Sequence, residues 1–301
     1  MPNDNRAIEI LFKIAIVLSI SLTGLISLSI HQRNEAVQRE INAKYEVIAE
    51  QNAAIVQTIV NESFTVALNL SDYLMETCYA ESQTEELQNK SIIYDEPISI
   101  EGYLAENYII HTALSAIVSP HIPITEVGIY FEPYAFSLME TYAFTITEPE
   151  NEQPIYTVMS TYDEYKYEYF YYRTIQDNQT STFLTASGKT CITTPIICYK
   201  GELVGVISIC VENNAFEAIR SNDEAKAYVL SDSLLSFYGG DELTSFTQDL
   251  STQSVQLLKE QMENEEAFFV TISTEDESYG CHMCPIFIFD EIWWSCVVSE
   301  L

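Results

Sequence analysis

The stretch 190-TCITTPIICYKGELVGVISICV-211 decides the fold of this chain. It holds two apolar runs rich in Val, Ile and Thr, Thr190–Tyr199 and Leu203–Val211, which are separated by Lys200-Gly201-Glu202. Short β-branched runs joined by a turn that contains glycine predict a β-hairpin. Apolar residues occupy successive positions in both runs, which is typical of strands covered on both faces. We therefore expect the hairpin inside a sheet, followed by a short helix at Ala215–Arg220.

The composition excludes some classes of partner. Of the 301 residues, 45 are Asp or Glu and 13 are Lys or Arg, so the formal net charge at pH 7 is −32. Such a surface repels a phosphate backbone, and we expect no nucleic-acid partner. Hydrophobic residues make up 47% of the chain and aromatic residues 12%, which predicts a folded protein with one large core or two small ones.

The segment 11–30, LFKIAIVLSISLTGLISLSI, has the length and apolar character of a bilayer crossing. We predict a transmembrane helix there, after a cytoplasmic N-terminus at 1–10. A cleaved signal peptide is the alternative, but 29-SIHQR-33 offers no cleavage site of the small-x-small type. Basic residues lie on both sides of the segment, so the positive-inside rule leaves the orientation open.

A long stalk helix is predicted at 31–80, because no Gly or Pro interrupts this range. Ile41, Ile48 and Ile55 recur every seven residues, and a neighbouring apolar track is interrupted by Asn52. The stripe predicts a homodimer formed through the stalk helix. The alternative is a helix that packs only on its own domain.

The helices and strands predicted after the stalk helix fall into two groups. The first group includes a helix at Tyr103–Val118 and a tyrosine-rich helix at Tyr162–Gln176, and the second includes a helix near Ser254–Glu263. Besides the hairpin, strands are expected at Glu126–Phe131, Pro154–Ser160, Thr182–Leu184, Ala227–Ser231, Phe268–Ser273, Tyr279–Phe289 and Trp293–Ser299. The two groups predict one module at 81–221 and a smaller one at 222–301.

Two further segments carry a family resemblance. Gly128–Phe136, GIYFEPYAF, is similar to a GIYFEP-x-AF segment of bacterial chemoreceptors, and Pro285-Ile286 precedes Trp293-Trp294 near the end of the chain. Together with the hairpin, these segments resemble the extracytoplasmic double Cache sensor domain over roughly residues 32–301. The resemblance implies an α+β fold: an N-terminal transmembrane helix, a long stalk helix, and two PAS-like antiparallel-sheet modules. Of these, 81–221 would be membrane-distal and 222–301 membrane-proximal.

The function that this resemblance implies is ligand sensing. The chain looks like the sensor region of a methyl-accepting chemotaxis receptor, held in the cell membrane by one N-terminal anchor with residues 31–301 outside. The sensor region of a histidine kinase or diguanylate cyclase is the alternative. Since no output domain follows, we expect a fragment, or else a protein that keeps only its sensor. We expect no enzymatic activity, catalytic residue or cofactor.

The resemblance also implies where a ligand would bind. In amino-acid-binding members, an Arg, a Trp and a Tyr on the helix of the module hold the ligand carboxylate, and an Asp at the end of the GV strand holds the ammonium. Here Cys210 stands at the Asp position, the Arg position falls on Tyr167 or Glu168, and the aromatic pair falls within Tyr169–Tyr172. We therefore expect a small molecule other than a typical free amino acid. The predicted ligand-binding residues are Tyr130, Tyr169, Phe170, Tyr171, Arg173 and Cys210.

The alternative is that these tyrosines form an amphipathic cap over the sheet, with buried rings and solvated hydroxyls. In that case they bind nothing. Partner proteins rather than small molecules would then be a possible stimulus.

The seven cysteines are an odd number, and several lie in apolar runs, where cysteine behaves as a small hydrophobe. We expect most of them to be free and buried. Cys281-His282-Met283-Cys284 has the spacing of a redox or metal motif, but positions i and i+3 of a strand face opposite sides, so we expect no Cys281–Cys284 disulfide. No second Cys pair or His cluster completes a zinc set, and we expect no metal. A thiol-active surface protein that uses Cys281 and Cys284 is an alternative of another class, as is an adhesive or purely structural surface protein.

Overall fold

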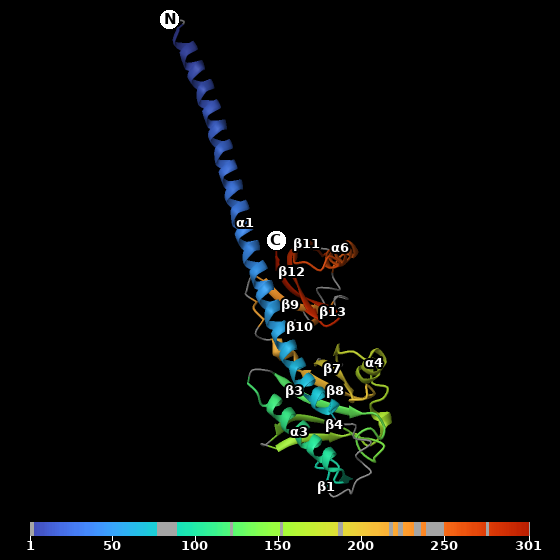
Figure 1. Cartoon of the computed structure of the whole chain (residues 1–301). Helices are drawn as coiled ribbons and strands as arrows, with labels where there is room; N and C mark the ends of the chain where they lie inside the picture. Colours follow the sequence, from blue (N-terminus) through green and yellow to red (C-terminus); the bar gives the residue numbers. More distant parts are fainter. Residues whose placement is uncertain are drawn as a thin grey trace. The chain divides into compact units, whose positions relative to one another are not determined.

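The structure is a computed structural model, and one long helix and two antiparallel sheets make up most of it (Figure 1). It describes residues 3–76, 89–120, 123–150, 153–185, 189–216, 219–221, 225–231, 236–238, 250–274 and 277–300. The chain forms two compact units, 1–48 and 49–301. Helix α1 (Asn3–Met75) supplies all of the described first unit and the beginning of the second.

Helix α1 confirms the predicted stalk helix as far as Met75, and 77–80 lie outside the described residues. From residue 18 to residue 30 its large apolar side chains are exposed, among them Leu18, Leu22 and Ile26. Among the residues whose side chains the structure describes, no helix is long and apolar enough to span a membrane. The side chains of 11, 12 and 14–17 are not among those residues, so the span at 11–30 stays a prediction.

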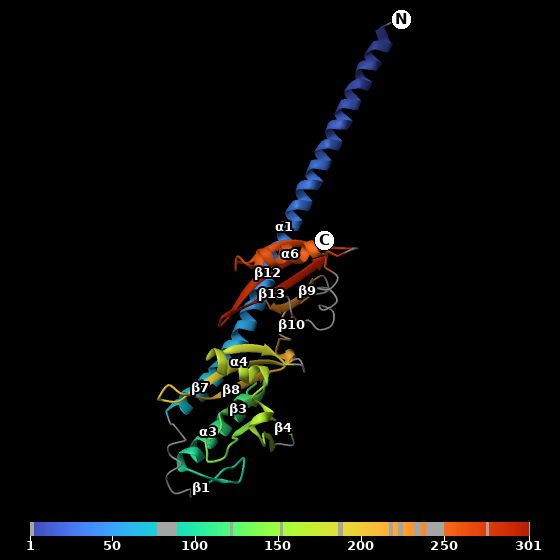
Figure 2. The same ribbon diagram turned by 90° about the vertical axis from the view of Figure 1, so that its right-hand side faces the viewer.

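The first sheet has six antiparallel strands in the order β5-β4-β3-β8-β7-β6. Its central strands β4, β3, β8 and β7 are labelled in Figures 1 and 2. Its strands are β3 (Ile124–Phe131), β4 (Ala143–Glu150), β5 (Gln153–Val158), β6 (Ser181–Leu184), β7 (Thr190–Ile197) and β8 (Leu203–Val211). The predicted hairpin is β7–β8, and β3 and β6 flank it. Its place inside the sheet is therefore confirmed, whereas β4 was missed.

The turn of this hairpin depends on glycine. Gly201 has φ +80, a left-handed backbone conformation that side chains with a Cβ rarely adopt. Its N–H donates to the carbonyl of Cys198 at 2.8 Å, and the N–H of Cys198 donates to the carbonyl of Glu202 at 2.8 Å. These two bonds close the turn and start the ladder between the two strands.

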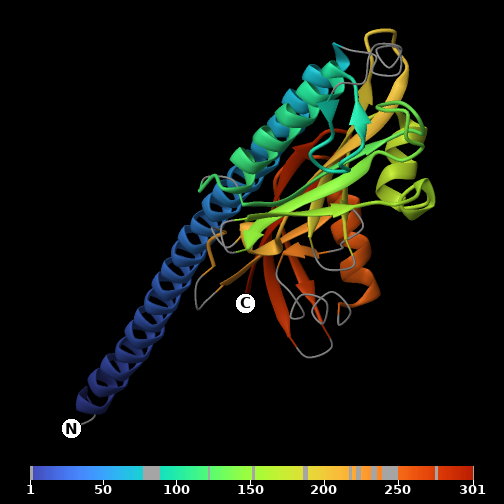
Figure 3. The same cartoon turned by 90° about the horizontal axis from the view of Figure 1, so that it is seen from below.

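Helices cover both faces of this sheet (Figure 3). Helix α3 (Ile100–Ile117) packs on β3 and β4, beside the later part of α1, whose Ser71 hydroxyl donates to the carbonyl of Pro195 at 3.1 Å. Helix α4 (Tyr169–Asp177) covers β6, β7 and β8 from the opposite face. The predicted single helix over Tyr162–Gln176 is thus wrong at its start, where a 3₁₀ turn, η1 (Tyr162–Glu164), and a loop precede α4.

A two-stranded ribbon, β1 (Asn89–Lys90) and β2 (Pro97–Ile98), lies next to α3. The buried carboxylate of Glu106 on α3 holds the turn between these strands. It accepts hydrogen bonds from the Ser91 hydroxyl at 2.5 Å and from the Ile92 N–H at 2.6 Å. This ribbon was not among the predicted strands.

The second sheet has five antiparallel strands in the order β10-β9-β13-β12-β11. Its elements are β9 (Ala225–Ser231), β10 (Ser236–Tyr238), helix α6 (Thr252–Met262), β11 (Phe268–Ser273), β12 (Ser278–Ile288) and β13 (Glu291–Glu300). Helix α6 begins after the N-cap Ser251, whose hydroxyl accepts from the Ser254 N–H at 3.1 Å, and packs on β11. The predicted strands and helix of this module are confirmed to within a few residues, but the module boundaries stay a prediction.

Before the second sheet, the short 3₁₀ helix η2 (Asn213–Phe216) takes the place of the helix expected at Ala215–Arg220. The chain then meets α1 at Asn52, which is fully buried. The Asn52 side chain accepts from the Arg220 N–H at 2.9 Å and donates to the Arg220 carbonyl at 3.1 Å. The residue that interrupts the apolar track of the stalk is thus an anchor for the segment between the two sheets.

Candidate functional site

Helix α4 divides the predicted ligand-binding residues into an inner and an outer group. Its buried side chains are Tyr171 and Thr174, whereas Tyr169 and Tyr172 are 57% and 56% exposed. The helix ends at Asn178, which has a left-handed backbone and donates its N–H to the Thr174 carbonyl at 3.0 Å. Asn tolerates this conformation better than most residues, so the end of α4 is encoded locally.

The inner group is a packed cluster of aromatic rings. The Tyr130 ring lies 5.0 Å from the Phe170 ring and 6.4 Å from the Tyr171 ring, between ring centres. The Tyr130 ring lies over Gly128, where a Cβ would come within 2.6 Å of it. Glycine in the GIYFEP segment is therefore required, because it gives this ring its place against the sheet.

Hydroxyl groups of the cluster converge on Glu132, at the end of β3. The Tyr171 hydroxyl donates to Glu132 Oε1 at 2.6 Å, and the Tyr162 hydroxyl lies 3.1 Å from both carboxylate oxygens. Burial and then the hydrogen bond to Glu132 raise the pKa of Tyr171 far above its ordinary value, so this phenol stays protonated. Glu132 was not among the predicted ligand-binding residues, although it lies within the GIYFEP segment.

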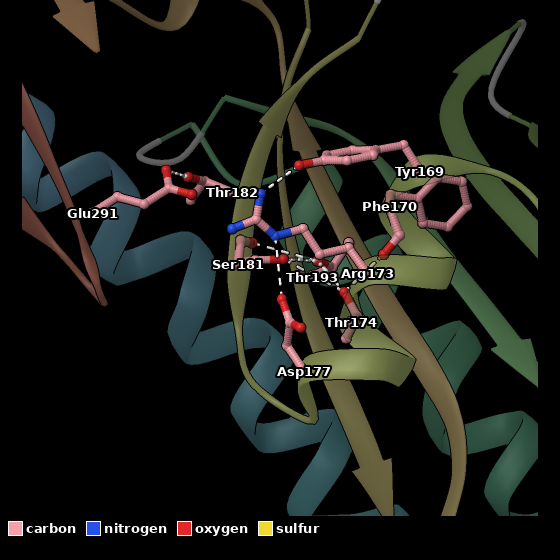
Figure 4. Close-up of polar contacts among 9 residues, drawn as sticks. All are labelled: Tyr169, Phe170, Arg173, Thr174, Asp177, Ser181, Thr182, Thr193 and Glu291. Carbon is pink, nitrogen blue, oxygen red and sulfur yellow. Dashed lines mark hydrogen bonds and ion pairs between the residues drawn. The ribbon is translucent and has the colours of Figure 1, made fainter. Parts of the chain in front are cut away.

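The outer group is centred on Arg173 (Figure 4). Its guanidinium donates to the Tyr169 hydroxyl through Nη1 and to Asp177 Oδ2 through Nε at 3.3 Å. The guanidinium carbon also lies 5.7 Å from the centre of the Tyr169 ring, in cation–π range. Arg173 is therefore a partly exposed cation that a ligand from solvent can reach.

A row of hydroxyls connects α4 to the edge of the sheet (Figure 4). The Thr174 hydroxyl donates to Thr193 Oγ1 at 2.7 Å, and Thr193 Oγ1 lies 3.0 Å from the Ser181 hydroxyl on β6. The next residue on β6, Thr182, donates to Glu291 Oε2 at 2.5 Å. Because Glu291 begins β13, this bond joins the two sheets.

Cys210 does not lie where a free thiol could meet a ligand. It forms a disulfide with Cys191, which lies directly opposite it on β7. On β8, Cys210 shares a face with Val206, which packs in the aromatic cluster, but it lies four residues further along, at about 3.3 Å per residue. The structure therefore brings together Tyr130, Phe170 and Tyr171, and separately Tyr169 and Arg173, but not Cys210.

The disulfide also corrects the expectation for the cysteines. Cys198, Cys281 and Cys296 are free and buried, as expected, and Cys284 is free and partly exposed. Most of the described cysteines are thus free, as expected, but Cys191 and Cys210 form a disulfide that was not predicted. Cys78 lies outside the described residues.

The geometry of the Cys281 to Cys284 motif is as predicted, with one thiol buried, the other partly exposed, and no bond between them. Hydrogen bonding by the Cys296 thiol and burial raise the pKa of Cys281 well above its ordinary value, and burial followed by the charge of Glu50 raises that of Cys284. The thiolate is the nucleophilic form, so raised pKa values argue against a thiol-active enzyme.

No protein-family model matches this sequence, and no curated protein matches it. Solved structures do. Methyl-accepting chemotaxis protein X superposes with a TM-score of 0.62 at 13% identity, over 88% of this chain and 99% of that one. The extracellular domain of the proposed histidine kinase soHK1S-Z6 gives 0.61 at 11% identity, over 86% of this chain and 94% of that one.

A third match has a ligand. The ligand-binding domain of the Pseudomonas aeruginosa amino acid chemoreceptor PctC, in complex with GABA, gives a TM-score of 0.54 at 12% identity, over 86% of this chain and 99% of that one. These likenesses confirm the predicted resemblance at the level of the fold. The chain has the fold of the Cache-type extracellular sensory domains of chemoreceptors and histidine kinases.

Proposed function

We propose that this chain is the extracytoplasmic ligand-sensing region of a transmembrane signalling receptor, with a methyl-accepting chemotaxis receptor as the first choice. The observation that carries the proposal is the fold: two antiparallel sheets are built along one long helix, as in sensory domains of known receptors. A histidine kinase sensor is the second choice, because chemoreceptor and kinase domains superpose equally well, with TM-scores of 0.62 and 0.61.

Membrane attachment through residues 11–30 belongs to the same proposal. The exposed apolar side chains of Leu18, Leu22 and Ile26 are those of a helix surface that a bilayer would cover. The Cys191–Cys210 disulfide supports an extracytoplasmic location for the sheets, because disulfides persist in oxidising compartments and are rare in the cytosol.

The ligand we propose is a small molecule that binds on the α4 side of the first sheet. Arg173 would meet a carboxylate or another anionic group, and the aromatic rings beside it would take the apolar part. The position that holds an ammonium in the amino-acid-binding relatives is here Cys210, which is bonded to Cys191 and carries no charge. An α-amino acid would therefore lack its second charged partner there, which favours a different class of ligand.

We further propose that the chain works as a homodimer through the stalk helix. Val37, Ile41 and Val47 are exposed apolar side chains in the first unit, and a second copy could cover them. Light scattering of the chain in detergent should give the mass of a dimer, and Ile41→Glu should shift that mass towards the monomer. If the unaltered chain and Ile41→Glu both have the mass of a monomer, the dimer is contradicted.

The test of ligand sensing is a thermal-shift screen of the full chain in lipid nanodiscs against small carboxylates, amines and neutral molecules. A ligand that binds the native state raises the midpoint as RT ln(1 + [L]/Kd). We expect hits among the carboxylates, a smaller shift in Arg173→Gln, and an unchanged shift in Lys200→Gln. The control removes one positive charge from the exposed hairpin turn instead.

Two failures would be distinguishable in this screen. If no compound of any class shifts the midpoint, small-molecule sensing is contradicted. If hits appear but Arg173→Gln responds like the control, the sensing proposal holds and the α4 site is wrong.

A further inference from the structure

Four sulfur atoms share one buried cluster under α6. Cys281 and Met283 lie on β12, Cys296 lies on β13, and Met262 lies on α6. Met283 is directly opposite Cys296, and alternation along the strand puts Cys281 on the same face as Met283. Cys281, Met283 and Cys296 are 1%, 2% and 3% exposed, so this set is shielded from solvent.

The register explains why the two thiols in this cluster are not joined. Cys191 and Cys210 are directly opposite each other, with their Cα atoms 4.0 Å apart, and they form a disulfide. Cys281 faces Val298, so its relation to Cys296 is diagonal. Diagonal neighbours have Cα atoms about 7–8 Å apart, beyond the roughly 4.4–6.8 Å usual for a disulfide. The two thiols are therefore poorly placed for an S–S bond.

A metal ion needs a longer span than a disulfide. Metal–thiolate bonds are about 2.3 Å, as for zinc, so two thiolates on one ion can lie up to about 4.6 Å apart, against about 2.05 Å in a disulfide. Two cysteines in diagonal positions can hold their sulfur atoms at this longer distance without a shift of the strands.

The donor set also selects the kind of ion. Thiolates and thioethers are soft ligands that favour Cu(I). A structural zinc ion prefers four Cys, His or carboxylate ligands, and no group of three or more such residues that could hold a metal occurs in the described part of the chain. Two thiolates and one monovalent cation leave a net charge of −1 at the site, so the preference for this ion rests on the softness of the donors and not on charge.

We propose that Cys281, Cys296 and Met283 form a buried site for a soft monovalent cation of the Cu(I) class, with Met262 of α6 available as a further thioether ligand. On binding, each thiol releases its proton, and the two thiolate sulfurs bond to the ion with no change in oxidation state. The ion would tie β12 to β13 and, through Met262, to α6. Access requires α6 to lift from the sheet, against the bond from the Ser254 hydroxyl to the Ser273 carbonyl at 3.1 Å.

The test is an anaerobic titration of the full chain, with its free thiols reduced, using Cu(I) in competition with a chromophoric Cu(I) chelator. We expect one ion per chain, the release of two protons per ion in a weakly buffered solution, and X-ray absorption that shows only sulfur neighbours. Cys281→Ala and Cys296→Ala should each abolish this stoichiometric binding. Met283→Leu, which keeps the volume and removes the sulfur, should weaken it.

Matched controls separate this site from the remaining thiols. Cys198→Ala removes a buried free thiol of the first sheet, and Cys284→Ala and Cys78→Ala remove the others. All three should bind Cu(I) like the unaltered chain. Far-UV circular dichroism checks that each variant is folded, and Cys281→Val replaces Cys281→Ala if the smaller residue unfolds the module. The proposal is overturned if the unaltered chain takes up no Cu(I), if folded Cys281 and Cys296 variants keep full binding, or if mild oxidation links Cys281 to Cys296.

Discussion

Replacing Asn52 by Ala should destabilise the protein by removing the anchor between α1 and the segment that enters the second sheet. Asn52 is 0% exposed and makes two hydrogen bonds, at 2.9 and 3.1 Å, with the backbone N–H and carbonyl of Arg220. A buried hydrogen bond contributes about 0.5–1.5 kcal/mol net. Two such bonds set an expected loss of about 2 kcal/mol in the free energy of unfolding. Arg220 itself is exposed, and water can solvate its backbone in the variant, so a much larger loss is not expected.

The matched control is Asn61→Ala. Asn61 lies on the same helix, is exposed, and its side chain accepts a hydrogen bond from the Gln57 side-chain amide at 3.0 Å. Both substitutions gain the same helix propensity from alanine, so their difference isolates the anchor. Asn61→Ala should change the free energy of unfolding by less than about 0.5 kcal/mol, as is usual for surface substitutions.

The assay is equilibrium unfolding in urea, followed by far-UV circular dichroism and by tryptophan fluorescence. The chain has only two tryptophans, Trp293 and Trp294, and both are buried in the second sheet. Fluorescence therefore reports on the module that the anchored segment enters, while circular dichroism reports on the whole chain. The reasoning is refuted if Asn52→Ala and Asn61→Ala unfold at the same urea concentration with the same slope.

Three further outcomes are expected. Cys191→Ala opens the loop of about 19 residues that the disulfide closes, and it should lower the free energy of unfolding, measured in urea, by about 3 kcal/mol. The unaltered chain with this disulfide reduced should unfold at the same urea concentration as the variant. Burial raises the pKa of Tyr94 to about 12, so its contribution to stability is complete below pH 10 and is lost as the pH rises from 10 through 12; burial raises the pKa of Tyr171 further, so this phenol should stay protonated while the protein is folded; phenolate absorbance should show both groups ionising late, and ordinary ionisation near pH 10 would contradict the packing. Thr182→Val, which keeps the shape and removes the bond to Glu291, should raise hydrogen exchange at the start of β13 and leave α4 unchanged; protection equal to that of the unaltered chain would mean that this bond does not couple the sheets.

The hairpin and the long helix could be predicted because their signals are local. A run of β-branched residues, a glycine turn and a stretch without Gly or Pro can each be recognised from neighbouring residues alone. Strand β4 was missed because 143-AFTITEPE-150 ends in acidic residues and a proline, which weaken a strand pattern. Hydrogen bonds from its partner strands β3 and β5 stabilise this strand, and they cannot be inferred from its own sequence.

The disulfide could not be predicted because it depends on register. A hairpin closed by Lys200-Gly201-Glu202 with regular pairing would place Cys191 opposite Val211. In the structure Ile197 pairs with Leu203, and this register continued regularly would put Cys191 opposite Ile209. However, Ile196 pairs with Gly205, and this shift of one residue brings Cys191 opposite Cys210. A one-residue irregularity in the ladder changes every later pair, and nothing in the local sequence marks it.

The candidate site was predicted in part. The aromatic residues were found because they are dense in the sequence, and the structure does place them on a helix over the hairpin. Glu132 and Glu291 were missed because their roles arise only when the ends of β3 and β13 meet other elements. An isolated glutamate has no spacing that separates such a role from that of a solvated surface residue.

The covalent bond between β7 and β8 limits which parts of the first sheet can respond to a ligand. Strands joined by hydrogen bonds alone can shift in register, but the disulfide between Cys191 and Cys210 fixes the register of β7 against β8. Strand β6 has a single neighbour and lies at the edge of the sheet. Movement of α4 should therefore be passed outward to β6 rather than inward through the hairpin. This makes the sheet edge that carries Thr182, and not its centre, the compliant part of the module.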